Sequence, residues 1–162
     1  MFEIQKASVN DIPLIRELAF KVWPQTYASM ISAEQIDYML DMMYSEASLE
    51  KQIGDGARFI FIYENKEPVG FASYQEISPA IFKLHKLYVL PSQQGKGTGR
   101  YIIEYIISEI KPLGAKALQL QVNRRNNAKY FYEKNGFSVI KEFDFDIGNG
   151  YVMDDYVMEK KL

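Results

Sequence analysis

A glycine-rich segment is the part of this 162-residue chain that most directly suggests chemistry. It reads Gln93-Gln94-Gly95-Lys96-Gly97-Thr98-Gly99-Arg100 and follows a run of apolar residues. Glycine has no Cβ atom, so the backbone can turn sharply and point several N–H groups into one concavity. An apolar run at helical spacing follows, and the N-terminus of a helix attracts anions. The segment therefore predicts an anion site, most often one for phosphate.

Two familiar phosphate-binding patterns do not fit this loop. A Walker A loop needs Gly-Lys followed by Ser or Thr, but here the Gly-Lys pair precedes Gly97. The dinucleotide pattern Gly-x-Gly-x-x-Gly, begun at Gly95, would need a glycine where the chain has Arg100. The pattern that fits is Gln/Arg-x-x-Gly-x-Gly/Ala, through Gln94, Gly97 and Gly99. The alternative is an ordinary strand-to-helix turn whose glycines serve packing alone.

Composition narrows the chemistry further. The chain has no cysteine, and His85 is its only histidine. A cysteine nucleophile, a disulfide framework and a zinc site built on Cys or several His are therefore excluded, and we expect no metal. No Gly-x-Ser-x-Gly segment is present to support a Ser-His-Asp triad. An enzyme of this composition needs little side-chain machinery or a reactive group brought in by its ligand.

Charge and hydropathy bear on the partners. Lys and Arg number 19 against 21 Asp and Glu, so no overall positive field attracts nucleic acid. The N-terminal residues lack the basic start and apolar stretch of a signal peptide. The richest apolar run, residues 101–110, contains two glutamates and is far shorter than the ~20 residues that span a bilayer. We expect a cytoplasmic protein with no nucleic-acid or membrane partner.

Hydrophobic periodicity predicts the elements that position the loop. The expected order, βααβββαβαββ, gives one α/β domain over residues 1–162 with a mixed sheet flanked by helices. Strands are expected at about 2–7, 58–64, 68–75, 81–90, 116–122, 137–144 and 151–160. Helices are expected after Asn10 or Asp11, after Ser32, and over 99–111 and 126–134, with a short helical piece through Leu49. Pro24 should end or kink the first helix.

Two segments together resemble the GNAT superfamily of acetyl-CoA-dependent N-acetyltransferases. The glycine-rich loop follows Leu87-Tyr-Val-Leu-Pro91 as the loop follows the fourth strand of that family. Residues 126–137 resemble the family's downstream Ala-x-x-Phe-Tyr-x-x-x-Gly-Phe segment. The order of elements agrees over essentially the whole chain, so a GNAT-like fold with a twisted, mostly antiparallel sheet is expected. Many members carry Asn three residues before the Ala, where this chain has Arg125 beside Asn126 and Asn127.

The resemblance implies acetyl-CoA as co-substrate and indicates which residues bind it. They are Leu87, Tyr88, Val89, Gln94, Gly95, Lys96, Gly97, Thr98, Gly99, Arg100, Asn127 and Lys134. The Lys96 and Arg100 cations can pair with the phosphates of CoA. Their alternative role is that of solvated loop cations.

Acetyl transfer to an amine needs a group that protonates the leaving thiolate. Tyr132 is the candidate general acid, because a phenol with an ordinary pKa near ~10 stays protonated at pH 7. The resemblance places this residue of the Phe-Tyr pair beside the sulfur of CoA. The alternative is that Tyr132, one of 12 tyrosines, only packs.

His85 is the candidate base, and the pattern around it predicts a β-bulge. Leu84 has even parity, whereas Leu87 and Val89 have odd parity, so one register slip falls around residues 85–86. The GNAT fold has a bulge in this strand, whose freed main-chain groups bind the acetyl carbonyl and pantetheine. A histidine there can deprotonate the incoming amine directly or through water. An ordinary strand histidine is the alternative.

The resemblance implies that the first two helices and the late strands shape the acceptor site. Trp23 and Tyr27 are the expected substrate-binding residues, with Asp144, Asp146, Asp154 and Asp155 near the C-terminus. Aromatic and carboxylate groups suit a small cationic amine, and the pattern resembles the polyamine acetyltransferase branch. These acids have a solvated hairpin face as their alternative role.

The predicted activity is therefore acetyl transfer from acetyl-CoA to a primary amine that attacks directly in a ternary complex. Two alternatives remain: a regulatory module that binds CoA without turnover, and acetylation of a protein amine. The late strands are also expected to be exposed, which would allow a homodimer.

Overall fold

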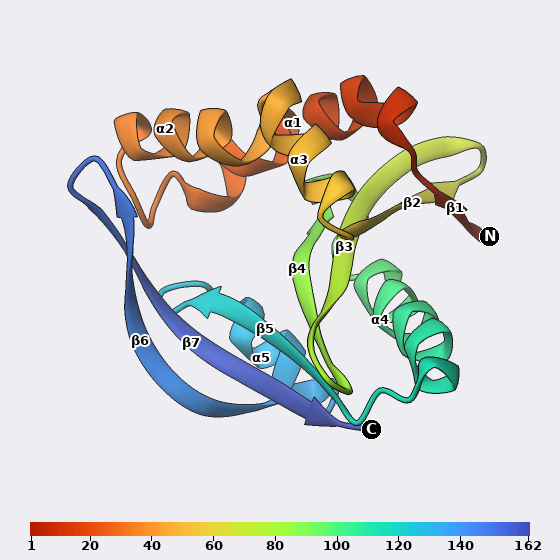
Figure 1. The fold of residues 1–162 in the computed structure, drawn as a ribbon. Coiled ribbons are helices and arrows are strands. Elements are labelled where there is room, and N and C mark those ends of the chain that lie inside the picture. Colours follow the sequence, from red (N-terminus) through yellow and green to blue (C-terminus); the bar gives the residue numbers. More distant parts are fainter.

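The computed structural model describes all residues, 1–162, as one seven-stranded sheet with five α-helices (Figure 1). The strands are β1 (Phe2–Lys6), β2 (Arg58–Glu64), β3 (Glu67–Ser78), β4 (Ile81–Val89), β5 (Ala117–Asn123), β6 (Ser138–Gly148) and β7 (Tyr151–Lys161). The helices are α1 (Ile12–Tyr27), α2 (Ala33–Tyr44), α3 (Glu46–Gly54), α4 (Thr98–Ile110) and α5 (Ala128–Lys134). None of the helices is both long and apolar enough to cross a membrane.

The strand order in the sheet is β1-β2-β3-β4-β5-β7-β6. All neighbours are antiparallel except β4 and β5, which are parallel. A parallel pair needs a long crossover connection, and here the glycine-rich loop and α4 provide it. The mixed, mostly antiparallel GNAT-like sheet expected from the sequence is confirmed.

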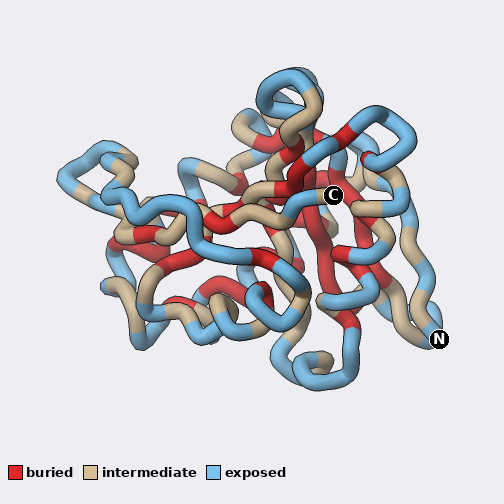
Figure 2. The backbone as a smooth tube through the Cα atoms, turned by 90° about the horizontal axis from the view of Figure 1, so that it is seen from below, coloured by how far each residue is buried: buried red, intermediate tan, exposed pale blue.

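Each face of the sheet buries its own hydrophobic core. On one face, α4 and α5 pack through residues such as Ile102, Ile106 and Tyr132 against Leu118 and Leu120. On the other face, the core is formed by α1, α2 and α3 with side chains of β2 and β3. Figure 2 shows the buried segments gathered inside and the exposed ones at the turns and the outer strands. The elements that flank the site are therefore held from both sides.

The N-terminal helices differ from the expectation in two ways. The short helical piece through Leu49 is a separate helix, α3, which begins after Ser45 because the hydroxyl of Ser45 accepts the N–H of Ser48. Pro24 does not end α1, which continues to Tyr27. The carbonyl that loses its usual donor at Pro24 belongs to Phe20, which is 47% exposed, so water can replace the missing N–H. Of the two outcomes expected at Pro24, an end or a kink, the end of the helix is excluded.

The predicted bulge in β4 is present. Ser73 pairs with Lys86 and Tyr74 with Leu84, so His85 is the extra residue. The slip turns Leu87 and Val89 toward the core under α4 and leaves Lys86 buried on the opposite face. There the amino group of Lys86 lies 5.2 Å from the ring centre of Tyr44, and burial lowers its pKa to about 8.

Strands β4 and β5 separate beyond the bulge. Their pairing covers only Ile81–Leu84 and Ala117–Leu120, although β4 continues to Val89 and β5 to Asn123. Over these last residues the two strand edges that face each other are unpaired. The opening between them is where the pocket described next begins.

Candidate active site

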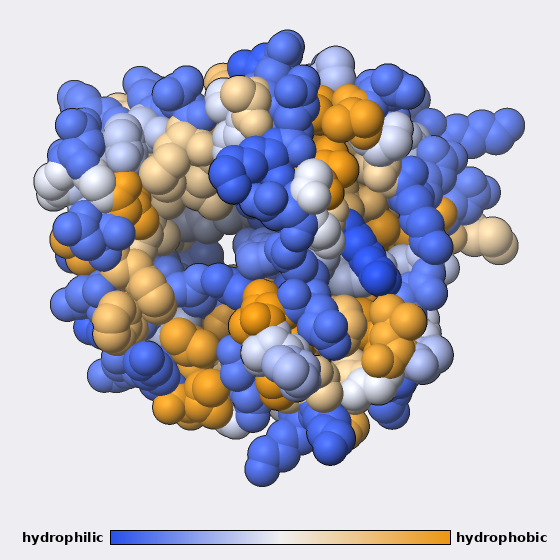
Figure 3. Space-filling model, viewed as in Figure 1, coloured by the Kyte–Doolittle hydropathy of each residue, from blue (hydrophilic) through white to orange (hydrophobic).

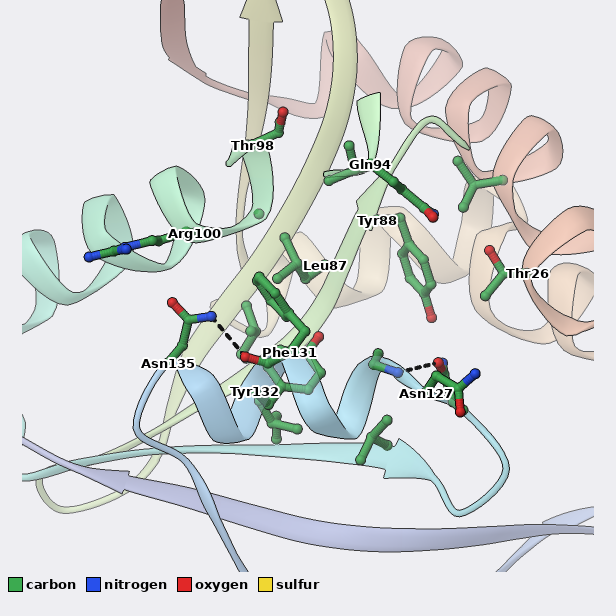
Figure 4. Close-up of a pocket in the computed structure, with 18 of the residues that line it drawn as sticks. Thr26, Leu87, Tyr88, Gln94, Thr98, Arg100, Asn127, Phe131, Tyr132 and Asn135 are labelled. Carbon is green, nitrogen blue, oxygen red and sulfur yellow. Dashed lines mark hydrogen bonds between the residues drawn. The ribbon is translucent and has the colours of Figure 1, made fainter. Parts of the chain in front are cut away.

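A pocket beside this opening, called here the main pocket, has a volume of about 680 Å³. It is lined by the end of α1, the bulged half of β4, the glycine-rich loop, the end of β5 and α5, and Figure 4 shows many of these side chains pointing into it. None of its lining residues is acidic, and Arg100 and Lys134 are basic. A pocket of this size and charge suits a large anionic ligand.

The glycine-rich loop offers backbone N–H groups to such a ligand. Gly95 and Gly97 both have φ of 81°, a left-handed conformation that favours glycine. The N–H groups of Gly95, Lys96 and Gly97 have no hydrogen-bond acceptor within the protein. Gly97 is also the N-cap of α4 and provides no side chain to satisfy the first N–H groups of the helix. Together these unsatisfied donors form a site for phosphate oxygens at the helix N-terminus.

The loop is in direct contact with the second GNAT-like segment. A Cβ atom at Gly99 would lie 2.9 Å from Cζ of Phe131, which leaves no room for a side chain at this position. The ring of Phe131 in turn lies 5.3 Å from that of Tyr132, edge to face. The two motifs are therefore one structural unit.

The cations expected to bind phosphates occupy different places. Arg100 lines the main pocket, but its guanidinium donates to Glu104 at 2.9 Å and is drawn in Figure 4 pointing away from the pocket. Lys134 lines the far end of the pocket and is exposed. Lys96 is exposed and does not line the pocket. Of the other residues assigned to CoA, all line the pocket: Leu87, Tyr88, Val89, Gln94, Gly95, Gly97, Thr98, Gly99 and Asn127.

Three asparagines line the pocket around α5. Asn126 accepts the N–H of Ala128 at 2.9 Å, and Asn135 donates to the carbonyl of Phe131 at 2.8 Å (Figure 4). The side chain of Asn127 makes no hydrogen bond within the protein and is exposed. Asn127 is thus the asparagine whose whole amide is available to a ligand, whereas Asn126 already uses its Oδ1 within the protein.

Three tyrosines meet at the inner end of the pocket. The hydroxyl groups of Tyr27 and Tyr88 are 3.0 Å apart, and Tyr132 is close enough to both to affect them electrostatically. Burial raises the pKa of Tyr27 to about 12 and that of Tyr132 well above its usual range. All three phenols therefore stay protonated at working pH.

Trp23, expected to bind substrate, is not part of the pocket lining. Only 1% of its surface is exposed, and its indole N–H donates to the hydroxyl of Tyr44 at 3.3 Å. Its ring lies 4.5 Å from that of Tyr27. Trp23 therefore supports Tyr27 from behind, and Thr26 is the neighbour that reaches the pocket.

His85 lines the pocket at the bulge, and its tautomer follows from its neighbour. Gln75 donates its Nε2 to the carbonyl of Asp55 at 2.7 Å, which turns its Oε1 toward His85. The Nε2 of His85 lies 3.1 Å from this oxygen and must donate, so Nδ1 carries the free lone pair. Burial, with Lys83 and Lys86 nearby, lowers the pKa of His85 to about 4. His85 is therefore neutral at pH 7.

The four late aspartates do not form one cluster. Asp144 and Asp154 lie at 3.6 Å and 2.6 Å from the guanidinium of Arg124, and Asp146 accepts the N–H of Gly148 in the hairpin turn. Only Asp155 is buried, with 5% of its surface exposed. Burial raises its pKa to about 6, an effect that the Asp154 charge adds to and that Lys83 and Arg124 oppose.

Asp155 faces the concave side of the sheet. It pairs with Asn123, two residues from Gln121 and Val157, which pair on the same face. Its charge influences the pKa of both Tyr27 on α1 and Lys83 on β4. The local sequence does not distinguish Asp155 from the other three aspartates. The register of β7 against β5 distinguishes it.

Comparison with known proteins identifies the family and the fold of the chain. Residues 27–159 match the family described as acetyltransferase (GNAT) domain, and the chain belongs to that family. Its members use acetyl-CoA as the acetyl donor. The protein is thus an N-acetyltransferase of the GNAT class.

Individual relatives include enzymes with different acceptors. A spermidine N(1)-acetyltransferase of Thermoplasma acidophilum is 28% identical over 98% of this chain and 96% of its own length. A [ribosomal protein bS18]-alanine N-acetyltransferase of Haemophilus influenzae is 30% identical over 60% of this chain and 66% of its own. The crystal structure of PaiA N-acetyltransferase from Thermoplasma acidophilum in complex with coenzyme A superposes with a TM-score of 0.83, covering 100% of this chain and 99% of that one at 28% identity.

Proposed function

We propose that the chain transfers the acetyl group of acetyl-CoA to the primary amine of a small molecule, by direct attack in a ternary complex. The observation that carries this proposal is the main pocket, which joins an anion-binding loop to a buried group of tyrosines and a neutral histidine. CoA supplies the activated thioester. In the reaction an N–C bond forms, the C–S bond breaks, the amine loses a proton and the thiolate gains one.

The loop and α5 hold the donor in this proposal. The free N–H groups of Gly95, Lys96 and Gly97 and the N-terminus of α4 bind the pyrophosphate, with Lys134 and Asn127 farther along the pocket. The unpaired edge of β4 over residues 87–89 binds the pantetheine chain. Lys96 can reach the phosphates from outside the pocket because its side chain is long and exposed.

Tyr132 is the proposed general acid. Its burial keeps the phenol protonated, and no hydrogen bond within the protein holds its hydroxyl in another direction. A neutral donor placed near the sulfur can give its proton to the leaving thiolate as the C–S bond breaks.

His85 is the proposed proton acceptor. With a pKa of about 4 it is too weak a base to deprotonate a free ammonium ion effectively. It can accept the proton that the amine nitrogen releases as the N–C bond forms, because acylation makes that nitrogen far more acidic. The free lone pair on Nδ1 is the accepting atom.

A polyamine is the acceptor that the sequence pattern predicts, and the relative that acetylates spermidine supports it. Tyr27 lines the main pocket, and the buried carboxylate of Asp155 lies behind the lining, near enough for its charge to act on Tyr27; these are the groups that would meet an ammonium ion.

An acetyl-CoA thiol-release assay against polyamines, amino acids, aminoglycosides and peptides tests the proposal. We expect release with at least one small primary amine. Binding of CoA without release on any amine would favour the alternative of a regulatory module, and release on peptides alone would favour a protein amine.

A further inference from the structure

A second pocket continues from the main pocket along the concave face of the sheet. This side groove has a volume of about 390 Å³ and shares Leu120 and Gln121 with the main pocket. Figure 3 shows a hollow on this side of the molecule, bordered by α1 and α2, β4 and the β6–β7 hairpin. The residues that line the side groove itself come from β3, β4, β5, β6 and β7. An acceptor whose amine reaches the main pocket therefore has the side groove available for the rest of its skeleton.

Most residues that line the side groove are apolar. Two of the others are lysines, and none is acidic. Its apolar residues are Ile77, Ile140, Phe145 and Val157, and its charged residues are Lys83 and Lys141. A polyamine has further ammonium groups after its reacting one, and each would have to lie in this groove against like charges. Repulsion of that kind selects against a partner as strongly as a matching contact selects for one.

Lys83 is positioned to bind an anionic group. Its amino group donates to Oε1 of Gln121 at 2.5 Å, and an ammonium ion has two further donors. No carboxylate forms an ion pair with Lys83. The charge of Asp155 is near enough to raise the pKa of Lys83, but the two side chains are not within ion-pair distance. Burial lowers the pKa of Lys83, so a negatively charged partner would relieve the cost of keeping it charged.

Asp155 is the complementary group. It is the buried aspartate of this face, and neither of its carboxylate oxygens has a hydrogen-bond donor, with Oδ1 fully enclosed. A buried carboxylate without donors is costly unless a cation arrives to pair with it. The other three late aspartates are occupied by Arg124 or by the hairpin turn, and Glu159 on the same face accepts from Gln119, so Asp155 is the buried carboxylate of this face without a donor.

We infer that the acceptor is a small zwitterion, an amine that also carries a carboxylate, whose ammonium group lies at Asp155 and whose carboxylate lies at Lys83. The inference rests on the proposed acetyltransferase activity and narrows its substrate class from amines in general to amino acids. It disfavours a polyamine, because Lys83 and Lys141 stand where its second ammonium group would lie.

The test uses acceptors of equal length that differ only at the far end. The set is 4-aminobutanoate, butylamine and 1,4-diaminobutane, with the six-carbon equivalents to allow for the length of the site. We expect kcat/KM to fall in that order, with at least about tenfold between the first and the last, as is typical when an attractive pair of charges is replaced by a repulsive one. A wild-type preference for the diamine or for spermidine would overturn the inference.

Substitutions at Lys83 test whether this side chain sets the preference for the acceptor. Lys83→Met should remove the preference for the amino acid over butylamine, Lys83→Arg should keep it, and Lys83→Glu should favour the diamine. Lys111→Met, at an exposed lysine outside both pockets, is the control. Thermal melting of each variant shows that it is folded. An unchanged preference in a folded Lys83→Met variant contradicts the assignment.

Failure of this inference and failure of the proposed function give different results. If no amine of any class causes thiol release, the proposed function is wrong. Calorimetric binding of 4-aminobutanoate and 1,4-diaminobutane with CoA present then still decides the inference, because this measurement needs no turnover. Tighter binding of the diamine would overturn it.

Discussion

The donor side and the acceptor side of the proposed active site are built in different ways. On the donor side, the ligand-binding groups are backbone N–H groups of one continuous loop, and the glycines that expose them are neighbours in the sequence. On the acceptor side, Tyr27, His85 and Asp155 come from α1, β4 and β7 and meet only through long-range packing. If these are the two sides of the site, the backbone side should tolerate changes of side chain but not of conformation, whereas single side chains should change the specificity of the acceptor side.

Among the substitutions that test this difference, the largest effect on activity is expected at Tyr132, where the donor side and the acceptor side meet. Tyr132→Phe removes the proposed proton donor, so kcat should fall by about 10²-fold or more while affinity for acetyl-CoA changes little. Steady-state kinetics with a direct binding measurement for acetyl-CoA separates the two quantities. Tyr130→Phe, on the exposed side of the same helix, is the control. Unchanged turnover in Tyr132→Phe would exclude it from the mechanism.

The next effect concerns the donor side alone. Gly99→Val places a side chain against Phe131, so the loop or the ring must move, and overpacking of this kind costs about 1–3 kcal/mol. Affinity for acetyl-CoA should fall about 10- to 100-fold, with the order of acceptors unchanged. Gly54→Ala, where a Cβ meets nothing within 4 Å, is the control. A changed order of acceptors would show that the two sides are not separable.

A smaller effect is expected on stability at the acceptor side. The pKa of Asp155 is about 6 in the folded protein against an ordinary 3.8, so between these pH values the folded state holds a proton that the unfolded state has lost. Stability therefore falls as pH rises through this window, and Asp155→Asn removes the loss. We expect the variant to gain about 1–3 kcal/mol in urea unfolding at pH 7.5. Asp37→Asn, at an exposed aspartate, should gain nothing; a loss of stability in Asp155→Asn contradicts the expectation.

The smallest effect is expected at His85. If Asp155 must be ionised to hold the acceptor, kcat/KM falls as pH drops through about 6, and this limb should persist in His85→Gln and be absent in Asp155→Asn. His85→Gln should lower kcat by about tenfold, because a base with a pKa near 4 contributes less than one matched to neutral pH. Profiles of both parameters between pH 4 and 8 check this. Loss of the limb near pH 6 in His85→Gln would assign it to the histidine instead.

The sequence was most informative where local rules decide the structure. The parity slip between Leu84 and Leu87 predicted the bulge, because alternation along a strand is set by its immediate neighbours. The glycines of the loop predicted a sharply turning backbone for the same reason, and Gly95 and Gly97 have positive φ. The boundaries of α4 and β5 fell within a residue or two of the expectation.

The sequence was least informative where contacts between distant segments decide the structure. Trp23 and Thr26 lie on the same helix, and only the packing of α1 on β4 shows that Thr26 rather than Trp23 reaches the pocket. The residue type alone does not distinguish the four late aspartates. The pairing of β7 with β5 buries one of them and leaves Arg124 to bind two others. The role of Pro24 depended on whether the carbonyl of Phe20 faces water.

The short pairing between β4 and β5 also has a mechanical consequence. The sheet is continuous across all its strands, but its two halves are joined by backbone pairing only at Ile81–Leu84 and Ala117–Leu120. The chain ends lie on different halves, with β1 on one and β7 on the other (Figure 1). A pulling force applied to the two termini acts on β1 and β7 and must pass across this parallel seam, which has fewer paired residues than any other pair of neighbouring strands in the sheet. The proposed opening for the two substrates therefore coincides with the shortest backbone pairing in the sheet.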